Sequence, residues 1–190
     1  MVSAAAPTRH ERSVFLDRDG VLVVPEFRDG RSFAPISLEQ FAVYPEAAAC
    51  LARLKAAGFQ LIVVTNQPDV GAGKISCETV TQMHAELAAK LPIDDIKVCF
   101  HTRDQRCTCR KPLPGMLIEA AAERAIDLPA SIMVGDRASD IDAGQAAGCR
   151  TAFIDHGYAA ELKPQSADFV GSSLSEVTEW ILSAEKARAR

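Results

Sequence analysis

Short apolar segments alternate with longer helix-like segments along this chain, and that alternation limits its fold more than any other feature. Residues 59–65 form a continuous run rich in branched apolar side chains, which is typical of a strand buried on both faces. Strands are predicted at residues 14–17, 59–65, 96–101, 131–135, 150–154 and 168–170, and helices at residues 45–57, 76–90, 114–126, 139–147 and 174–186. This order predicts an α/β fold in three layers, with a Rossmann-like parallel sheet covered by helices on both faces.

Length and charge narrow the class of protein. A chain of 190 residues can form one domain with a sizeable core, which we place at residues 13–190 behind a flexible leader of residues 1–12. The net charge of −4 disfavours a general nucleic-acid binder or a binder of anionic membranes. No apolar run approaches the roughly 18 residues that span a bilayer, and the leader lacks the apolar core of a signal peptide. We therefore expect a cytoplasmic monomer that binds neither nucleic acid nor membrane.

Two aspartates, Asp17 and Asp19, follow the first predicted strand, and Gly20 then allows the chain to turn. Paired carboxylates at the end of a strand suit a divalent cation, a phosphate or both. Because the backbone can twist where a strand ends, the two side chains can take different roles on one target. For this short segment alone, the alternative is a solvated turn, since Asp and Gly are common turn residues.

Polar residues also follow the other predicted strands. They are Thr65, Asn66 and Gln67 after the second strand, Arg110 and Lys111 after the third, and Asp136 after the fourth. Because ligands of parallel sheets bind beyond the carboxyl ends of the strands, we expect these groups to converge with the aspartate pair. Asp140 comes four residues after Asp136. It either contacts residues of the site without touching the ligand itself, or serves as the negative charge at the N-terminus of the next helix.

A compact group of metal-binding residue types precedes the two cations. Cys99, His101, Cys107 and Cys109 have the spacing C-x-H-x5-C-x-C, which supplies three thiolates and one imidazole. This set completes a tetrahedral Zn²⁺ site and leaves no position for a catalytic water, so the predicted role is structural. The site ends directly before the two cations, and we expect zinc to stiffen their loop. Scattered thiols with an incidental histidine are the alternative.

Taken in order, the motifs resemble the four motifs of the haloacid dehalogenase superfamily over residues 14–153. They are Asp17-Arg18-Asp19-Gly20-Val21, Thr65-Asn66, Lys111, and Gly135-Asp136 with Asp140. The resemblance implies phosphoryl transfer through an aspartyl-phosphate, with Asp17 as the nucleophile and Asp19 as the general acid and base. It further implies that Thr65 and Lys111 hold the phosphoryl group. By the same resemblance, Mg²⁺ is held by Asp17, Asp136 and the backbone carbonyl of Asp19.

The loop of residues 99–109, which carries the four predicted zinc ligands and is called the zinc loop below, narrows the resemblance to particular phosphatases within the superfamily. A zinc loop directly before Arg-Lys-Pro is similar to the D-glycero-D-manno-heptose 1,7-bisphosphate phosphatases and to the related histidinol-phosphate phosphatases, and the run KPLPGM at residues 111–116 is closer to the first group. The expected partner is therefore a small phosphorylated sugar, with histidinol phosphate as the alternative. An alternative of another class is a catalytically silent, zinc-stabilised binding module. Substrate contacts are expected at Asn66, Gln67, Arg110, Arg137 and Arg28.

The motifs lie too close together for a separate cap domain between them. Substrate selectivity should then come from short loops at residues 24–36 and 68–74 and from the zinc loop. Val23 and Pro68 depart from the family pattern near the expected substrate entrance. The sequence indicates no partner for His84, and His156-Gly157-Tyr158 is interpreted as a polar turn.

Overall fold

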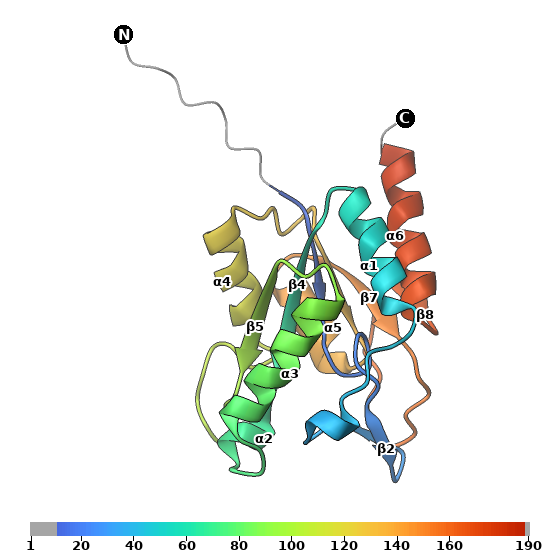
Figure 1. Ribbon diagram of the computed structural model, residues 1–190. Helices are drawn as coiled ribbons and strands as arrows, with labels where there is room; N and C mark the ends of the chain where they lie inside the picture. Colours follow the sequence, from blue (N-terminus) through green and yellow to red (C-terminus); the bar gives the residue numbers. More distant parts are fainter. Residues whose placement is uncertain (1–10, 189–190) are drawn as a thin grey trace.

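A six-stranded parallel sheet forms the centre of the protein, in a computed structural model that describes residues 11–188 (Figure 1). Its strands are β1 (Ser13–Leu16), β4 (Gln60–Asn66), β5 (Asp95–Cys99), β6 (Ile132–Gly135), β7 (Arg150–Ile154) and β8 (Phe169–Gly171). They lie in the order β5-β4-β1-β6-β7-β8. Every neighbouring pair in this sheet runs parallel, as the alternation of segments predicted.

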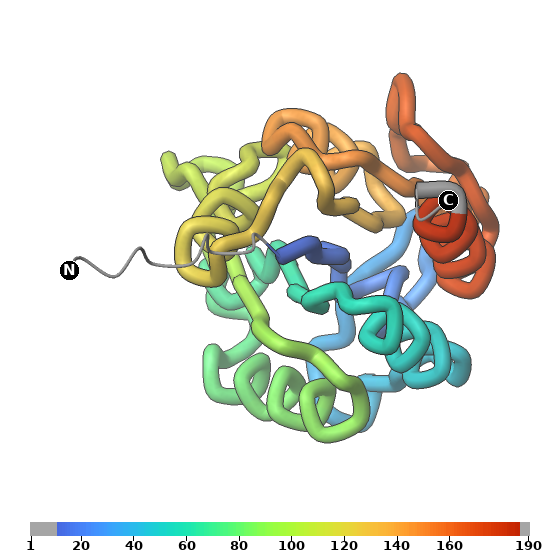
Figure 2. The backbone as a smooth tube through the Cα atoms, turned by 90° about the horizontal axis from the view of Figure 1, so that it is seen from above, coloured from blue at the N-terminus to red at the C-terminus, as the bar shows by residue number. Residues whose placement is uncertain are grey.

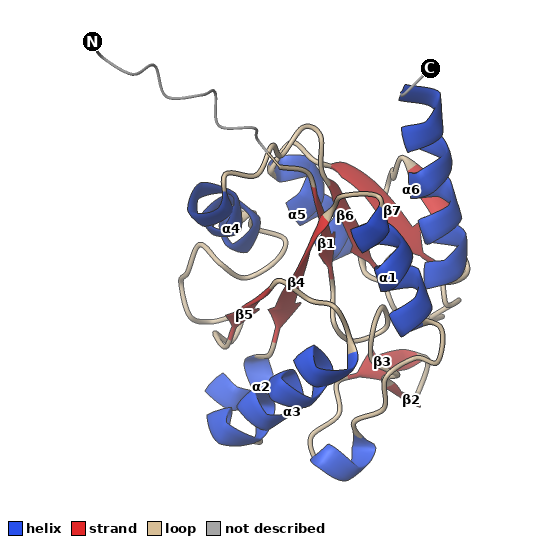
Figure 3. Ribbon diagram, turned by 45° about the horizontal axis from the view of Figure 1, so that its top comes forward, coloured by secondary structure: helices blue, strands red, loops and turns tan. Residues whose placement is uncertain are grey.

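Helices cover both faces of the sheet (Figure 3). One face packs against α1 (Ala47–Ala56), α3 (Cys77–Lys90) and α6 (Leu174–Arg188), and the other against α4 (Gly115–Arg124) and α5 (Ala138–Ala146). Helices α1 and α6 lie side by side (Figure 2). Side chains of β1 alternate between the two cores, since Val14 and Leu16 belong to the first and Phe15 to the second. The expected three-layer architecture is confirmed.

Short elements outside the sheet were not predicted. β2 (Glu26–Arg28) and β3 (Arg31–Phe33) form an antiparallel hairpin, and the 3-10 helix η1 (Leu38–Gln40) follows it. α2 (Pro68–Gly71) is a single turn of helix. All three residues of β2 are exposed, so the hairpin has no run of buried apolar side chains from which periodicity could reveal it. It lies within the loop of residues 24–36, where substrate selectivity was expected.

The expected leader is described only at its C-terminal end, because residues 1–10 lie outside the described part of the chain. The main chain of Glu11 accepts from Asp127 and donates to Ala125. The Arg12 guanidinium lies 4.7 Å from the centroid of the Phe59 ring. Among the helices between residues 11 and 188, none has both the length and the apolar composition needed to cross a membrane.

Strand β1 lies at the point in the sheet where the direction of strand addition reverses. It pairs with β4 on one side and with β6 on the other, so the carboxyl ends of three adjacent strands meet at one edge. Asp17 follows β1, Thr65 lies at the end of β4, and Asp136 follows β6. Open parallel sheets bind ligands at such a switch point.

Candidate active site

Asp17 and Lys111 form a buried ion pair at this edge. Lys111 Nζ lies 2.7 Å from Asp17 Oδ1 and 2.6 Å from Asp140 Oδ1, and it donates to the Val64 carbonyl oxygen at 2.7 Å. Burial alone would lower the pKa of Lys111, but the negative charges of Asp140 and Asp17 outweigh it and raise that pKa. The lysine is therefore held as a cation between two carboxylates.

Asp140 takes both of the roles that the sequence left open. Its Oδ1 pairs with Lys111, and its Oδ2 accepts from the main-chain N–H of Arg137 at 3.0 Å, in the capping box at the start of α5. Burial raises the pKa of Asp140 to about 6, and the charge of Lys111 limits that rise. The side chain thus joins a helix N-terminus to the lysine of the site.

Asp136 has no such partner. It is 2% exposed, and among the described residues neither of its carboxylate oxygens has a donor at ordinary hydrogen-bond geometry; the Tyr158 hydroxyl interacts with it only more weakly. One oxygen each from Asp17, Asp136 and Asp140 lie within 4.8 Å of one another. Burial raises the pKa of Asp136 well above its usual range, and the charges of Asp17 and Asp140 raise it further. Buried oxygens without donors beside other carboxylates are the ligand type that a hard cation such as Mg²⁺ prefers.

The turn after Asp19 approaches Asp136 closely. Gly20 has a φ of 87°, and a Cβ atom there would lie 1.9 Å from Asp136 Oδ2. Only glycine fits both the conformation and the space. His156 Nε2 donates to the Gly20 carbonyl oxygen at 2.7 Å, which gives the turn a second contact.

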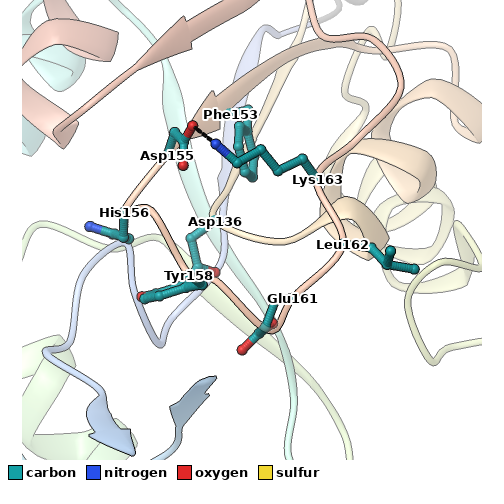
Figure 4. Close-up of a pocket in the computed structure, with 8 residues that line it drawn as sticks. All are labelled: Asp136, Phe153, Asp155, His156, Tyr158, Glu161, Leu162 and Lys163. Atoms are coloured by element: carbon teal, nitrogen blue, oxygen red, sulfur yellow. Dashed lines mark hydrogen bonds and ion pairs between the residues drawn. The ribbon is translucent and has the colours of Figure 1, made fainter. Parts of the chain in front are cut away.

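A loop after β7 lies beside Asp136, and its part in the site was not predicted. Figure 4 shows Asp136 among side chains of this loop, which include His156, Tyr158 and Glu161. Tyr158 has its pKa raised by burial and then by the negative charge of Asp136. The interpretation of residues 156–158 as a mere polar turn is incomplete. A signal was available, because these residues follow the carboxyl end of β7, at the same edge as Asp136.

Asp19 has a different set of partners from Asp17. Arg18 Nε and Nη2 donate to its two oxygens at 3.0 and 3.1 Å. Gln67 Nε2 donates to Asp19 Oδ2 at 2.7 Å and lies 3.0 Å from Thr65 Oγ1. Gln67 therefore links the second aspartate to the end of β4.

Asn66 contacts Lys111 through both ends of its side-chain amide. Nδ2 donates to the Lys111 carbonyl oxygen at 3.0 Å, and Oδ1 accepts from the Lys111 N–H at 3.1 Å. Because the amide is occupied by these two bonds, its role in this geometry is to hold the backbone that carries the lysine. A direct contact between Asn66 and substrate stays a prediction.

The four predicted zinc ligands come together beside the site. The Sγ atoms of Cys99 and Cys109 are 3.1 Å apart, and His101 Nδ1 lies 3.4 Å from the first and 3.3 Å from the second. Cys107 Sγ is 4.0 Å from Cys99 Sγ, and all four ligand atoms lie within 4.8 Å of one another. Around a zinc ion with sulfur ligands at about 2.3 Å, the edges of the tetrahedron measure about 3.8 Å. The cluster therefore has the chemistry and the approximate size of a single Zn²⁺ site.

The site opens onto a cleft of about 1190 Å³, between the hairpin, the zinc loop and the loop after β7. Its basic lining residues are Arg31, Lys74, Arg103, Arg106, Arg110, Lys111 and Arg137. Its acidic lining residues are Asp17, Asp19, Asp69, Asp140 and Glu161, so the basic side chains outnumber the acidic ones in the cleft, although the whole protein has a net charge of −4. A cationic cleft in an acidic protein favours a small anionic substrate.

Arg137 and Arg28, both predicted to contact substrate, also have partners within the protein. Arg137 Nη2 donates to the carbonyl oxygen and to Oγ of Ser32, both at 2.7 Å, which ties α5 to the hairpin. Arg28 is not brought to the cleft, since its Nε pairs with Glu26 Oε1 at 3.2 Å on the exposed hairpin. Arg31, on the next strand of that hairpin, lines the cleft in its place.

Two further interpretations of the sequence need correction. Val23 does not lie at the substrate entrance, because it is fully buried in the core and forms a bridge with Val43. Pro68, by contrast, lines the cleft as expected. His84 does have a partner, since its Nε2 lies 3.2 Å from Arg18 Nη1.

Sequence comparison relates the chain to one group of phosphatases. The family model described as HAD-hydrolase-like matches residues 108–177. The D-glycero-alpha-D-manno-heptose-1,7-bisphosphate 7-phosphatase of Mycobacterium tuberculosis is 40% identical over 137 residues, which cover 67% of this chain and 68% of that protein. The D-glycero-beta-D-manno-heptose-1,7-bisphosphate 7-phosphatase of Rhodopseudomonas palustris is 35% identical over 147 residues, which cover 71% and 77%.

Solved structures resemble nearly the whole chain. The D,D-heptose 1,7-bisphosphate phosphatase of B. bronchiseptica, in complex with magnesium and phosphate, has a TM-score of 0.78 at 28% identity. The alignment covers 91% of this chain and 99% of that one. The D,D-heptose 1,7-bisphosphate phosphatase of Burkholderia thailandensis has a TM-score of 0.65 at 25% identity, with the same coverage of both chains.

Proposed function

Because this phosphatase belongs to the heptose 1,7-bisphosphate 7-phosphatase family of haloacid dehalogenase-like hydrolases, we propose that it removes the 7-phosphate of a D-glycero-D-manno-heptose 1,7-bisphosphate. One observation carries the proposal. Asp17 Oδ1 lies 2.7 Å from Lys111 Nζ, an Asp17 oxygen lies within 4.8 Å of an oxygen of the buried Asp136 carboxylate, and Asp17 lines a cleft in which basic side chains outnumber acidic ones. That arrangement suits a carboxylate that must approach a phosphate.

The proposed reaction has two displacements at phosphorus. Asp17 Oδ attacks the phosphorus atom, and the bond to the sugar oxygen breaks while Asp19 gives that oxygen its proton. A water molecule then attacks the aspartyl-phosphate, and Asp19 takes a proton from it. Inorganic phosphate leaves, and Asp17 is a carboxylate again. Lys111 offsets the repulsion between the attacking carboxylate and the phosphate oxygens.

Mg²⁺ fits the carboxylates at this edge. Asp17 and Asp136 are the proposed side-chain ligands, and the backbone carbonyl of Asp19 is the third protein ligand. The buried Asp136 oxygens without donors support this assignment. When bound, the ion supplies positive charge that offsets the negative charge of the transferring phosphoryl group.

Zn²⁺ fits the four ligands of the zinc loop, where its proposed role is structural. Arg110 Nη1 donates to the His101 carbonyl oxygen at 3.1 Å, so the loop and the cation beside Lys111 are joined directly. A zinc ion that holds His101 and Cys109 would therefore also hold the entrance of the cleft.

The charge of the cleft favours a sugar bisphosphate over histidinol phosphate. A bisphosphate carries a second phosphate, and basic side chains beyond Lys111, such as Arg103 and Arg106, line the cleft to receive it. Histidinol phosphate carries an amine cation in place of that second phosphate. Because basic side chains outnumber acidic ones in the lining, the cleft disfavours the amine.

A kinetic comparison tests the proposed substrate. The value of kcat/KM is measured with Mg²⁺ for heptose 1,7-bisphosphate in both anomers and for histidinol phosphate. We expect the kcat/KM of at least one anomer to exceed the kcat/KM of histidinol phosphate by about 100-fold or more. This ratio corresponds to about 2.7 kcal/mol of preferential transition-state binding. Equal values, or a preference for histidinol phosphate, would overturn the proposed substrate.

A further inference from the structure

Arg18 has an unusual position for a charged side chain, because it is 0% exposed and stands in the sequence between Asp17 and Asp19. Its Nε and Nη2 form a bidentate pair with the two oxygens of Asp19. Its Nη1 lies 3.2 Å from His84 Nε2, and its guanidinium carbon lies 5.7 Å from the centroid of the Phe41 ring. A guanidinium has only donors, so each buried N–H group needs an acceptor.

His84 supplies such an acceptor from α3. Because Arg18 can only donate, the contact requires a neutral imidazole that accepts at Nε2 and carries its proton on Nδ1. Burial, and to a smaller extent the charge of Arg18, lower the pKa of His84 to about 4. The ring is therefore neutral at physiological pH and suited to this contact.

We propose that Arg18 and His84 are positioning residues that aim the Asp19 carboxylate at the sugar oxygen that leaves and at the water that attacks. The inference rests on the proposed role of Asp19 as general acid and base. Within the described contacts, Arg18 holds both oxygens of Asp19, whereas Gln67 holds only one. If His84 no longer accepts from Nη1, the buried guanidinium turns toward another acceptor. Proton transfer by Asp19 then suffers, because it depends steeply on alignment.

Two neutral substitutions separate positioning from packing. The amide of Gln reaches the place of Nε2, whereas the shorter amide of Asn ends near Nδ1, so His84→Gln keeps the contact and His84→Asn loses it. Gln82→Leu is the control, because Gln82 is exposed on the same helix. Each variant is assayed for kcat/KM with heptose 1,7-bisphosphate and with p-nitrophenyl phosphate. Nitrophenolate leaves without taking up a proton. Transfer of the phosphoryl group from p-nitrophenyl phosphate to Asp17 therefore does not need Asp19 as an acid.

The expected result depends on the leaving group. His84→Asn should lower kcat/KM for the sugar bisphosphate by about 10-fold or more, and for p-nitrophenyl phosphate by less than about twofold. The kcat/KM of His84→Gln should stay within about threefold of the wild-type value on both substrates. The kcat/KM of Gln82→Leu should equal the wild-type value. Equal losses on both substrates, equal behaviour of the Asn and Gln variants, or no loss at all would each overturn the proposal.

A failure of the proposed substrate gives a different outcome. In that case wild-type protein turns over p-nitrophenyl phosphate but not the heptose bisphosphate. Glycerol phosphate then replaces it as the alkyl phosphate, and the same ratio between alkyl and aryl substrates decides whether His84 and Arg18 position Asp19.

Discussion

The side chain of Asn66 holds the main chain of Lys111 from both sides, with its Nδ2 3.0 Å from the lysine carbonyl oxygen and its Oδ1 3.1 Å from the lysine nitrogen. These two residues come from different parts of the fold, since Asn66 ends β4 and Lys111 follows the zinc loop. The contact fixes the point from which Lys111 reaches down to Asp17. A strand end thereby positions the buried cation that pairs with Asp17 and that lies on a loop.

Replacing Asn66 with alanine tests this positioning. We expect kcat to fall by about 10- to 100-fold, because the Lys111 main chain loses two hydrogen bonds and the ammonium shifts from Asp17. KM should change less than kcat, because the cationic cleft remains. The control is Gln145→Ala, which removes an exposed amide. This amide donates to the Ser166 carbonyl oxygen, and both residues are distant from Lys111 in the sequence. Steady-state kinetics with wild-type values of kcat for Asn66→Ala would show that Lys111 is held by other contacts.

Asp136 should carry a cost in stability when no metal is bound. Its folded-state pKa lies above the ordinary value of 3.8, so the folded protein binds this proton more tightly than the unfolded chain does. Stability from this group is therefore fully present below pH 3.8 and is lost as pH rises through the raised pKa. Asp136→Asn has no carboxyl group to ionise, so the variant avoids this loss of stability as pH rises. We expect metal-free Asp136→Asn to melt about 2 °C or more above metal-free wild type at pH 7.5.

The same variant should lose activity and its response to magnesium. Scanning calorimetry should show that Mg²⁺ raises the Tm of wild type but not of Asp136→Asn. Phosphatase activity should fall by about 100-fold or more, because several kcal/mol of charge stabilisation are lost. A Tm of Asp136→Asn that still rises with Mg²⁺ would place the ion elsewhere.

His84 should make the protein less stable in acid. Its pKa falls from 6.5 in the unfolded chain to about 4 in the folded protein. The unfolded chain therefore binds more protons between these values, so the contribution of His84 is present above pH 6.5 and is lost as pH falls toward 4. Measured from pH 8 to pH 4, the Tm of wild type should fall more steeply than that of His84→Gln. Parallel curves would mean that the partly buried His84 ring is not held neutral in the folded protein.

The zinc loop predicts the metal content of the purified protein. Freshly purified protein should contain about one zinc ion per chain, since the four ligands form a closed site. Cys107→Ser should bind less than half of that and lose about 10-fold in kcat, because the loop carries Arg110 and Lys111. Cys77→Ser is the control, because Cys77 is exposed and lies outside the cluster. Elemental analysis that finds little zinc in wild type, or full zinc and activity in Cys107→Ser, contradicts the assignment.

The sequence was most informative where function follows directly from a strand end. Asp17, Thr65 and Asp136 could be placed at one edge because each follows an apolar run, and parallel strands end together. Helix and strand positions agree with the predicted ranges to within about two residues, which is the usual uncertainty of such boundaries.

The rest depends on contacts between distant segments. His156 meets Gly20, and His84 meets Arg18, only because the fold brings separate turns and helices together. Neither pair leaves a periodic pattern in the sequence. Val23 was misplaced for a related reason, since the turn after Gly20 leads the chain back into the core rather than along the cleft.

The central claim is that Asp17 carries the phosphoryl group, and a rapid-quench experiment tests it most directly. Wild-type protein with Mg²⁺ is mixed with heptose bisphosphate labelled in the 7-phosphate, quenched in acid at millisecond intervals, digested and analysed by mass spectrometry. We expect the label on the peptide that contains Asp17 before free phosphate accumulates, and no labelled peptide and no turnover in Asp17→Asn. Free phosphate that forms without labelled peptide, or turnover that persists in Asp17→Asn, contradicts the account.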